Sequence, residues 1–348
     1  MKGCSYSFLS IACTRLLLCA ISAVGLSFSI QNSLAQFGNP RFSPNEEYLA
    51  FDYCRPQCNF VLYSLKSESA VSFDPPKGEA WINPSFGARS NYIVFVAIGT
   101  PENTQITTIE LNGGNLRKVT SSALIKRSPS VSPDDKTIVF TGGSKTVTER
   151  GTSSSVDIYL VDVGMDGERR VTDLRTRDIG APFFLADGRR ITFATVGSAI
   201  PRSKLPEPMV FLDKLYPNRT VFVLPIDPSA GLEPVVHEPL VISAPTPLAS
   251  DAIAVLTRVN DIDGIKSPFV YDIFLTRNGK ATRYTTFRSY VWSYGISRSG
   301  ELVAYVTDGP RRDRKETRLM LWRRSTGKAV EVVLPSVKQI SPRNEQSR

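Results

Sequence analysis

Short runs of alternating hydrophobic and polar residues fill the chain after its first 35 positions, and most of them end at Pro, Gly, Asn or Asp. Val131–Phe140 (VSPDDKTIVF) shows the unit: a strand end, a tight turn, and a new strand that finishes on an aromatic residue. Alternation with a period of two between such turn residues predicts β-strands. No stretch of this region keeps a 3.6-residue apolar period, so we expect few helices.

The ten-residue frame of Val131–Phe140 occurs six times without insertion or deletion, and the copies start 44, 45, 53, 63 and 49 residues apart. Each frame is followed by an apolar or alternating strand, and usually by a glycine-containing turn and one more strand. Asn-Gly and Asp-Gly turns of this kind connect hairpins. The other five frames are Phe42–Phe51, Phe86–Phe95, Phe184–Phe193, Pro247–Leu256 and Ile296–Tyr305.

Each repeat therefore carries four short strands. Four strands repeated at this spacing are typical of a β-propeller, because a single blade cannot bury both of its faces and blades packed in a ring cover one another. We predict an all-β fold, a six-bladed β-propeller of four-stranded antiparallel blades. It would span residues 36–335, with a polar C-terminal tail at residues 336–348.

The motif resembles that of the TolB-like, or PD40 (WD40-like), β-propeller family. The closest copy combines Ser132-Pro133-Asp134 with Ile158-Tyr159-Leu160 and Arg170-Val171-Thr172. The resemblance covers Pro40–Leu334 and implies the propeller fold. It implies little about a site, because these family motifs are turn and strand chemistry.

Two departures from the family limit what the resemblance implies. TolB has an N-terminal α/β domain before its propeller, whereas only Gln36–Asn39 stand between the expected leader and the first frame, so the Tol–Pal role is not carried over. Some family peptidases add a hydrolase domain. Here the nearest string to GxSxG is Gly295–Ser299, which lacks the final glycine and falls in a blade turn.

Residues 1–35 have the pattern of a secretory signal peptide. Lys2 and Arg15 precede the apolar run Leu16–Ile30, and Ser33–Ala35 offers small residues for cleavage. An uncleaved anchor and a lipoprotein modified at Cys13 or Cys19 are the alternatives. We expect a periplasmic or secreted mature protein that begins near Gln36 and has no transmembrane segment.

Export leaves two cysteines, Cys54 and Cys58, on either side of a short turn between two strand-like runs. Opposed residues of an antiparallel pair lie close enough for a disulfide, and an oxidising compartment favours the bond. A redox or metal dithiol is the alternative, but the spacing is CxxxC and no second pair exists to complete a zinc site.

The chain has a formal charge of +9, or +7 after residue 35, and a single histidine, His237. One histidine excludes metal sites that use two or three histidines of one chain, and any catalytic triad would have to use His237 itself. Its setting, Val235–Pro239, indicates the surface of an outer strand. We expect no metal, no cofactor and no catalytic residue.

The candidate binding residues lie in long connections between second and third strands, which share one face of a propeller. Arg311, Arg312, Arg314 and Lys315 form a basic run that could bind an acidic partner or anionic envelope polymer, or could be a solvated hairpin tip. Met209 and Phe211 stand on a proline-rich insertion and could anchor a partner or pack on their own blade. The long connections are 142–156, 197–219, 259–269 and 308–317.

These features predict a monomeric, non-enzymatic scaffold that binds a protein partner of the cell envelope through the long-loop face and the central channel. Nucleic acid is not expected, because export separates the protein from the genome and no aromatic residues alternate with the basic run. The alternative is a carbohydrate-binding protein, or a carbohydrate-active lyase or hydrolase that uses acidic residues at the channel mouth. Paired carboxylates suffice for such chemistry, but here the carboxylates are scattered.

Overall fold

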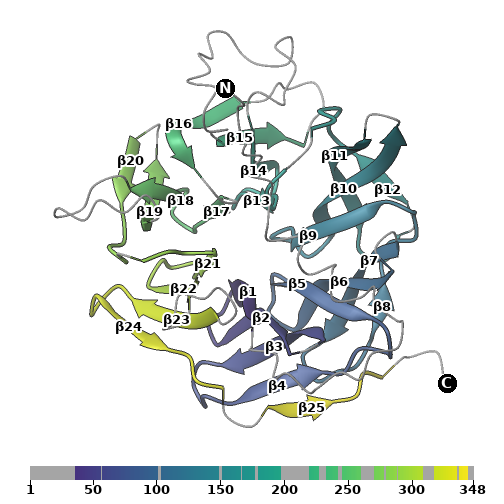
Figure 1. Cartoon of the computed structure of the whole chain (residues 1–348), viewed down its shortest axis with the longest axis horizontal. Helices are drawn as coiled ribbons and strands as arrows, with labels where there is room; N and C mark the ends of the chain where they lie inside the picture. The colour runs from purple at the N-terminus through teal and green to yellow at the C-terminus, as the bar shows by residue number, and fades with distance from the viewer. Residues whose placement is uncertain are drawn as a thin grey trace, which may run out of the picture. The chain divides into compact units, whose positions relative to one another are not determined.

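Six blades of antiparallel strands, which pair into five sheets, follow one another in a ring in the computed structural model (Figure 1). Residues 34–348 form one compact unit. All regular structure in the described residues is β-strand, and no helix there is long and apolar enough to cross a membrane. The structure describes residues 36–343 apart from 56, 101–102, 149–150, 166, 177–178, 197–218, 227–232, 242–244, 260–269, 278–279, 288, 309–316 and 335–336.

Blades 1 to 3 are regular meanders in which each strand pairs with the next one along the chain. Blade 3 has a long hairpin, because its second and third strands remain paired up to Thr148 and Gly151. The strands are β1 (Gln36–Phe42), β2 (Tyr48–Cys54), β3 (Cys58–Ser64) and β4 (Ala70–Phe73); β5 (Ala80–Phe86), β6 (Tyr92–Thr100), β7 (Asn103–Glu110) and β8 (Arg117–Lys118); and β9 (Ile125–Val131), β10 (Thr137–Thr148), β11 (Gly151–Asp162) and β12 (Glu168–Arg170).

Blades 4 to 6 follow the same order, so the predicted all-β six-bladed propeller is confirmed. Blades 4 and 5 join into one larger sheet, because Val241 of the outermost strand of blade 4 pairs with Thr257 of blade 5. The strands are β13 (Phe183–Phe184), β14 (Arg190–Val196), β15 (Arg219–Pro225) and β16 (Glu233–Val241); β17 (Thr246–Pro247), β18 (Ile253–Val259), β19 (Val270–Arg277) and β20 (Lys280–Arg283); and β21 (Ser293–Ile296), β22 (Leu302–Asp308), β23 (Thr317–Arg323) and β24 (Lys328–Glu331).

The repeated frame folds into the same turn in every blade. Its fifth residue has a left-handed backbone, with φ between 58° and 81°, whether that residue is glycine or not. In three blades the serine at the second position accepts a hydrogen bond from the backbone N–H at the seventh, as Ser132 does from Thr137 at 2.9 Å. The six left-handed residues are Glu46, Ser90, Asp135, Gly188, Asp251 and Gly300.

The hydrophobic core is divided into six clusters, one in each interface between neighbouring blades. Between blades 1 and 2, for example, the fully buried Phe60, Phe73 and Phe95 pack around Trp81. Burial of one large apolar side chain stabilises a fold by about 1.5–3 kcal/mol. The blades therefore depend on one another for stability.

The ring closes where β21 of blade 6 packs beside β1 of blade 1. Asn39 N donates to Ser293 Oγ at 3.2 Å, and Phe37 N donates to Thr317 Oγ1 at 2.7 Å. A Cβ atom at Gly295 would collide with the carbonyl oxygen of Pro40, so the seam requires glycine at this position.

A short strand in the C-terminal segment adds a second connection across the seam. β25 (Lys338–Ile340) leaves blade 6 and pairs in parallel with β4, at the outer edge of blade 1 (Figure 1). Ile340 packs against the blade 1–2 core, and Arg343 N donates to Gly113 O of blade 2 at 2.9 Å. The segment for which the sequence predicts a polar tail thus contains a strand.

Candidate functional site at the channel mouth

A cavity of about 180 Å³ lies where the six inner strands meet the tight turns, at the opposite end of the blades from the second-to-third-strand connections that hold the predicted binding residues. All six blades contribute to its wall, and the first residue of every frame lines it. All six of these residues are apolar, so the repeated frame builds an apolar ring around the channel. The six residues are Phe42, Phe86, Val131, Phe184, Pro247 and Ile296.

Arg41 is one of two charged residues in this wall. Its Nη1 donates to the backbone oxygens of Pro40 and Tyr294, both at 3.0 Å, and its guanidinium lies 5.0 Å from the centre of the Phe183 ring. No carboxylate of the described residues lies within ion-pair distance of Arg41, and none accepts a hydrogen bond from its Nε or Nη2. Burial lowers the pKa of Arg41, although Tyr294 and Asp52 act in the opposite direction.

Arg298 is the second charged residue of the wall, and it is exposed at the rim. The remaining lining residues are apolar, small or hydroxyl-bearing, and none of them is Asp or Glu. A low-dielectric wall with charge of one sign strengthens the field inside a cleft. The mouth of the channel is therefore suited to an anionic group.

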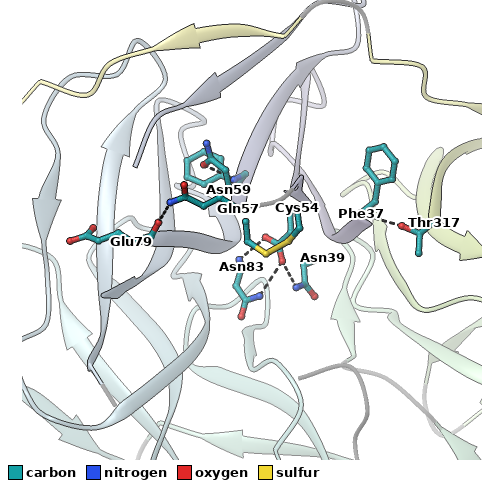
Figure 2. Close-up of a disulfide and its surroundings, with 11 residues drawn as sticks. Phe37, Asn39, Cys54, Gln57, Asn59, Glu79, Asn83 and Thr317 are labelled. Carbon is teal, nitrogen blue, oxygen red and sulfur yellow. Dashed lines mark hydrogen bonds between the residues drawn. A yellow bond between two sulfur atoms is a disulfide. The ribbon is translucent and has the colours of Figure 1, made fainter. Parts of the chain in front are cut away.

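Asp52 lies on β2, opposite Gly38 of β1 and outside the set of residues that line the cavity, and joins blades 1 and 2. It accepts hydrogen bonds from Asn39 Nδ2 at 2.7 Å and from Asn83 N at 2.7 Å, and Figure 2 shows both asparagines beside the disulfide. Burial raises the pKa of Asp52 from 3.8 to about 6, against the opposing effect of these hydrogen bonds and of Arg41. Asn39 and Asn83 have left-handed backbones and each directly precedes a proline, so Asp52 also holds two strained bulges in place.

Lys126 is a second buried charge, and it lies between blades 2 and 3. Its side chain is fully buried, and Nζ donates to Ser122 O at 2.6 Å and to Leu124 O at 3.3 Å. Glu168 Oε1 lies 3.7 Å away. Burial lowers the pKa of Lys126, and Glu168 opposes this effect. These contacts hold the link between blades 2 and 3 together.

Two aspartates on third strands, Asp157 in β11 and Asp272 in β19, also have structural roles. Asp157 Oδ1 accepts hydrogen bonds from Thr172 Oγ1 at 2.8 Å and from Leu174 N at 2.6 Å. Asp272 makes the corresponding contact with Thr285 in blade 5. Each of these carboxylates fixes the chain as it leaves the fourth strand for the next blade.

A larger hollow of about 990 Å³ follows the outer half of blade 2. Its wall mixes both signs of charge, with Glu79 and Glu110 beside Arg117 and Lys118, and includes the large side chains of Trp81 and Tyr92. Because positive and negative side chains lie side by side, the hollow does not favour a ligand of either charge. We therefore take the channel mouth, and not this hollow, as the candidate site.

The predicted disulfide between Cys54 and Cys58 is present, and the two residues oppose each other at the end of the β2–β3 hairpin (Figure 2). Gln57, inside the closed loop, donates from Nε2 to the backbone oxygen of Glu79 in blade 2. The disulfide thus shapes a turn that contacts the neighbouring blade.

The other predicted site residues lie outside the described residues: Arg311, Arg312, Arg314, Lys315, Met209 and Phe211. The strands on either side of the basic run are described, and they pair up to Asp308 and Thr317. Trp292 Nε1 donates to Asp308 Oδ1 at 2.7 Å, so the base of that connection is fixed within blade 6.

Two further predictions can be compared with the structure. The expected long connection at residues 142–156 is wrong, because β10 and β11 pair through this region up to Thr148 and Gly151. Its alternating Thr, Ser and Val residues suit a strand, which explains the difference. His237 lies in β16, the outermost strand of blade 4, as expected.

Neither Arg41 nor Asp52 is among the site residues predicted from the sequence. A signal for Arg41 exists, because it occupies the position directly before the frame. Aligning that position in all six repeats would have singled out one charged residue pointing into a shared channel. The corresponding residues of the other repeats are Ser85, Ser130, Phe183, Thr246 and Gly295.

Comparison with solved structures reveals many propellers. TolB from Acinetobacter baumannii superposes with a TM-score of 0.56 at 14% identity, over 88% of this chain and 65% of that one, so the chain spans less than two thirds of that protein. The likeness shows the fold. An oligogalacturonate lyase in complex with manganese gives a TM-score of 0.55 at 13% identity, over 87% of this chain and 78% of the other. A chain of a nidogen/laminin complex gives 0.54 at 11% identity, over 88% and 97%.

No protein-family model matches the sequence, and no curated protein matches it. Within the described residues, no group of three or more His, Cys, Asp or Glu side chains could hold a metal ion.

Proposed function

We propose that the chain is an exported, non-enzymatic TolB-like propeller of the PD40 type that binds a protein partner of the cell envelope, with the channel as part of the binding surface. The observation that carries this proposal is the channel mouth, where all six blades supply an apolar wall with two arginines. Apolar walls with a few placed polar groups are typical of binding sites.

The chemistry of the wall favours binding over catalysis. A guanidinium stays protonated at physiological pH, so Arg41 can attract and orient an anion but cannot exchange protons with a substrate. Asp52 is the buried carboxylate whose charge acts on Arg41. Both of its oxygens already accept hydrogen bonds from Asn39 and Asn83.

Export and the periplasmic or secreted location remain part of the proposal. The disulfide supports them, because such bonds persist mainly in oxidising compartments. The likeness to TolB is compatible with an envelope protein.

A carbohydrate-active protein is the second candidate. The likeness to an oligogalacturonate lyase supports it, together with the pKa of about 6 at Asp52, which lies in the range of a general acid. It ranks second because two carboxylates normally flank the bond that a glycoside hydrolase cleaves, and the described wall presents arginines instead.

The test is crosslinking of the mature protein, residues 36–348, in envelope extract, followed by identification of what co-purifies. A partner lost on Ala186→Trp, which places a bulky side chain at the channel rim, supports the proposal. Arg311→Glu, Arg312→Glu and Arg314→Glu together should retain the fold and lose an acidic partner that uses the basic run. Polysaccharide turnover that is lost on Asp52→Asn, with no protein partner recovered, would replace the proposal with the second candidate.

A further inference from the structure

The geometry points to a specific ligand chemistry for the channel mouth: a carboxylate on an apolar stem, supplied by the C-terminal residue of a partner polypeptide and held by Arg41. This inference rests on the proposed function and goes beyond it by naming the group that is recognised. Three features of the mouth carry it.

The first feature is the unused hydrogen-bonding capacity of Arg41. Within the described residues, the guanidinium donates two hydrogen bonds, both from Nη1, to Pro40 O and Tyr294 O. Nothing in the described residues accepts from Nε or Nη2. These two N–H groups form the fork that binds a carboxylate through two parallel hydrogen bonds.

The second feature is that the orientation of Arg41 is fixed before any ligand arrives. The two backbone carbonyls hold Nη1 at 3.0 Å, and the ring of Phe183 lies 5.0 Å from the guanidinium. A guanidinium over an aromatic face is held by cation–π attraction. The side chain would therefore lose little entropy on binding, which favours affinity.

The third feature is the composition of the surrounding wall. Phe42, Phe86 and Phe184 supply apolar surface beside the arginine, and Arg298 adds positive charge at the rim. Hydroxyl-rich sugars would find few partners on this surface, whereas an apolar side chain attached to a carboxylate fits both parts of it. A cavity of about 180 Å³ has room for one terminal residue and not for a longer segment.

Isothermal titration calorimetry with four probes tests the inference. The probes are phenylpropionate, an acetylated tetrapeptide that ends in leucine with a free carboxylate, the same peptide as its C-terminal amide, and galacturonate. We expect the acid peptide and phenylpropionate to bind, and the amide and galacturonate to bind at least about tenfold more weakly, because the charge-assisted pair with Arg41 or the apolar contact is lost.

Three variants locate the binding. Arg41→Gln and Ala186→Trp should each weaken binding of the acid peptide about tenfold or more. Arg169→Gln, which removes the same charge from the exposed strand β12, should leave it unchanged. Because Arg41 also bridges blades 1 and 6, Arg41→Gln could fail to fold; Ala186→Trp changes only an exposed rim residue and keeps the test decisive.

The outcomes separate this inference from the proposed function. Equal binding of acid and amide, or unchanged binding by both channel variants, would overturn the carboxylate site. Binding of phenylpropionate without the acid peptide would overturn the polypeptide source, and tighter binding of galacturonate would overturn the apolar stem. If the inference fails in any of these ways while the crosslinked partner is still recovered, the proposed function stands without it.

Discussion

Ionisation of Asp52 should make the stability of the ring depend on pH in an unusual direction. Burial raises the pKa of Asp52 in the folded protein from 3.8 to about 6, so the folded state holds this proton more tightly than the unfolded chain does. Stability is therefore greatest below the unfolded pKa and falls as pH rises through the folded value. One pKa unit corresponds to about 1.4 kcal/mol, so the full loss is about 3 kcal/mol, of which about 2 kcal/mol falls between pH 4 and pH 7.

Urea unfolding of the wild type and of Asp52→Asn at a series of pH values measures this effect. Asparagine is neutral and can keep a hydrogen bond to Asn83 N, so the difference between the two proteins removes the contribution of all other titrating groups. Relative to the variant, the wild type should lose about 2 kcal/mol from pH 4 to pH 7.

Asp162→Asn is the matched control, because Asp162 is exposed on the outer half of blade 3. Its pH profile should follow that of the wild type. A constant difference between wild type and Asp52→Asn across the pH series, or a wild type that loses stability relative to the variant as pH falls, would show that burial does not govern Asp52 and would refute the reasoning.

Three further predictions concern stability. Lys126→Met should lower the free energy of unfolding by about 3–5 kcal/mol, because it leaves the Glu168 carboxylate without its buried partner; urea denaturation measures the loss. Cys54 and Cys58 should resist thiol labelling until the protein is reduced, and their replacement by serine should cost about 2 kcal/mol, read from the same unfolding curves. Ile340→Asp should release β25 and cost about 1–2 kcal/mol, visible as faster amide hydrogen exchange along β4.

Each of these has a contradicting result. Lys328 is exposed on the edge strand β24, so Lys328→Met should leave the free energy of unfolding unchanged. An equal loss of stability in Lys126→Met and Lys328→Met would show that the buried Lys126–Glu168 pair does not stabilise the fold. Immediate labelling of native protein would show that the thiols are free. Unchanged exchange along β4 in Ile340→Asp would show that β25 does not protect this edge.

The blade architecture could be predicted because its determinants are local. The frame around Ser132-Pro133-Asp134 sets a turn whose left-handed fifth residue recurs in all six blades, even where Glu46 or Ser90 replaces glycine. Local turn chemistry and period-two alternation repeat in every unit, so the repeats reinforce one another. The number of blades follows from the number of frames.

The candidate site and β25 could not be predicted as readily, because both depend on partners distant in the sequence. Lys338–Ile340 is short and mostly polar, and it becomes a strand only by pairing with β4. In the sequence, Arg41 is one basic residue among many. Its position is fixed by Phe183 and Tyr294, which belong to other blades and contact its guanidinium. Residues 142–156 show the opposite error, since their polar composition suggested a loop and their pairing partner made them strands.

The closure of the ring has a consequence for how the protein is made. Every blade consists of strands that are contiguous in the sequence, so each can form as soon as it emerges from the ribosome. The seam is different: Asn39 and Ser293, which meet across it, are 254 residues apart, and β4 gains its last neighbour only when residues 338–340 have been made. Until then the first blade has an exposed flank and an open strand edge, which invites pairing with other chains. The nascent chain should therefore need protection by a chaperone for almost the whole of its synthesis.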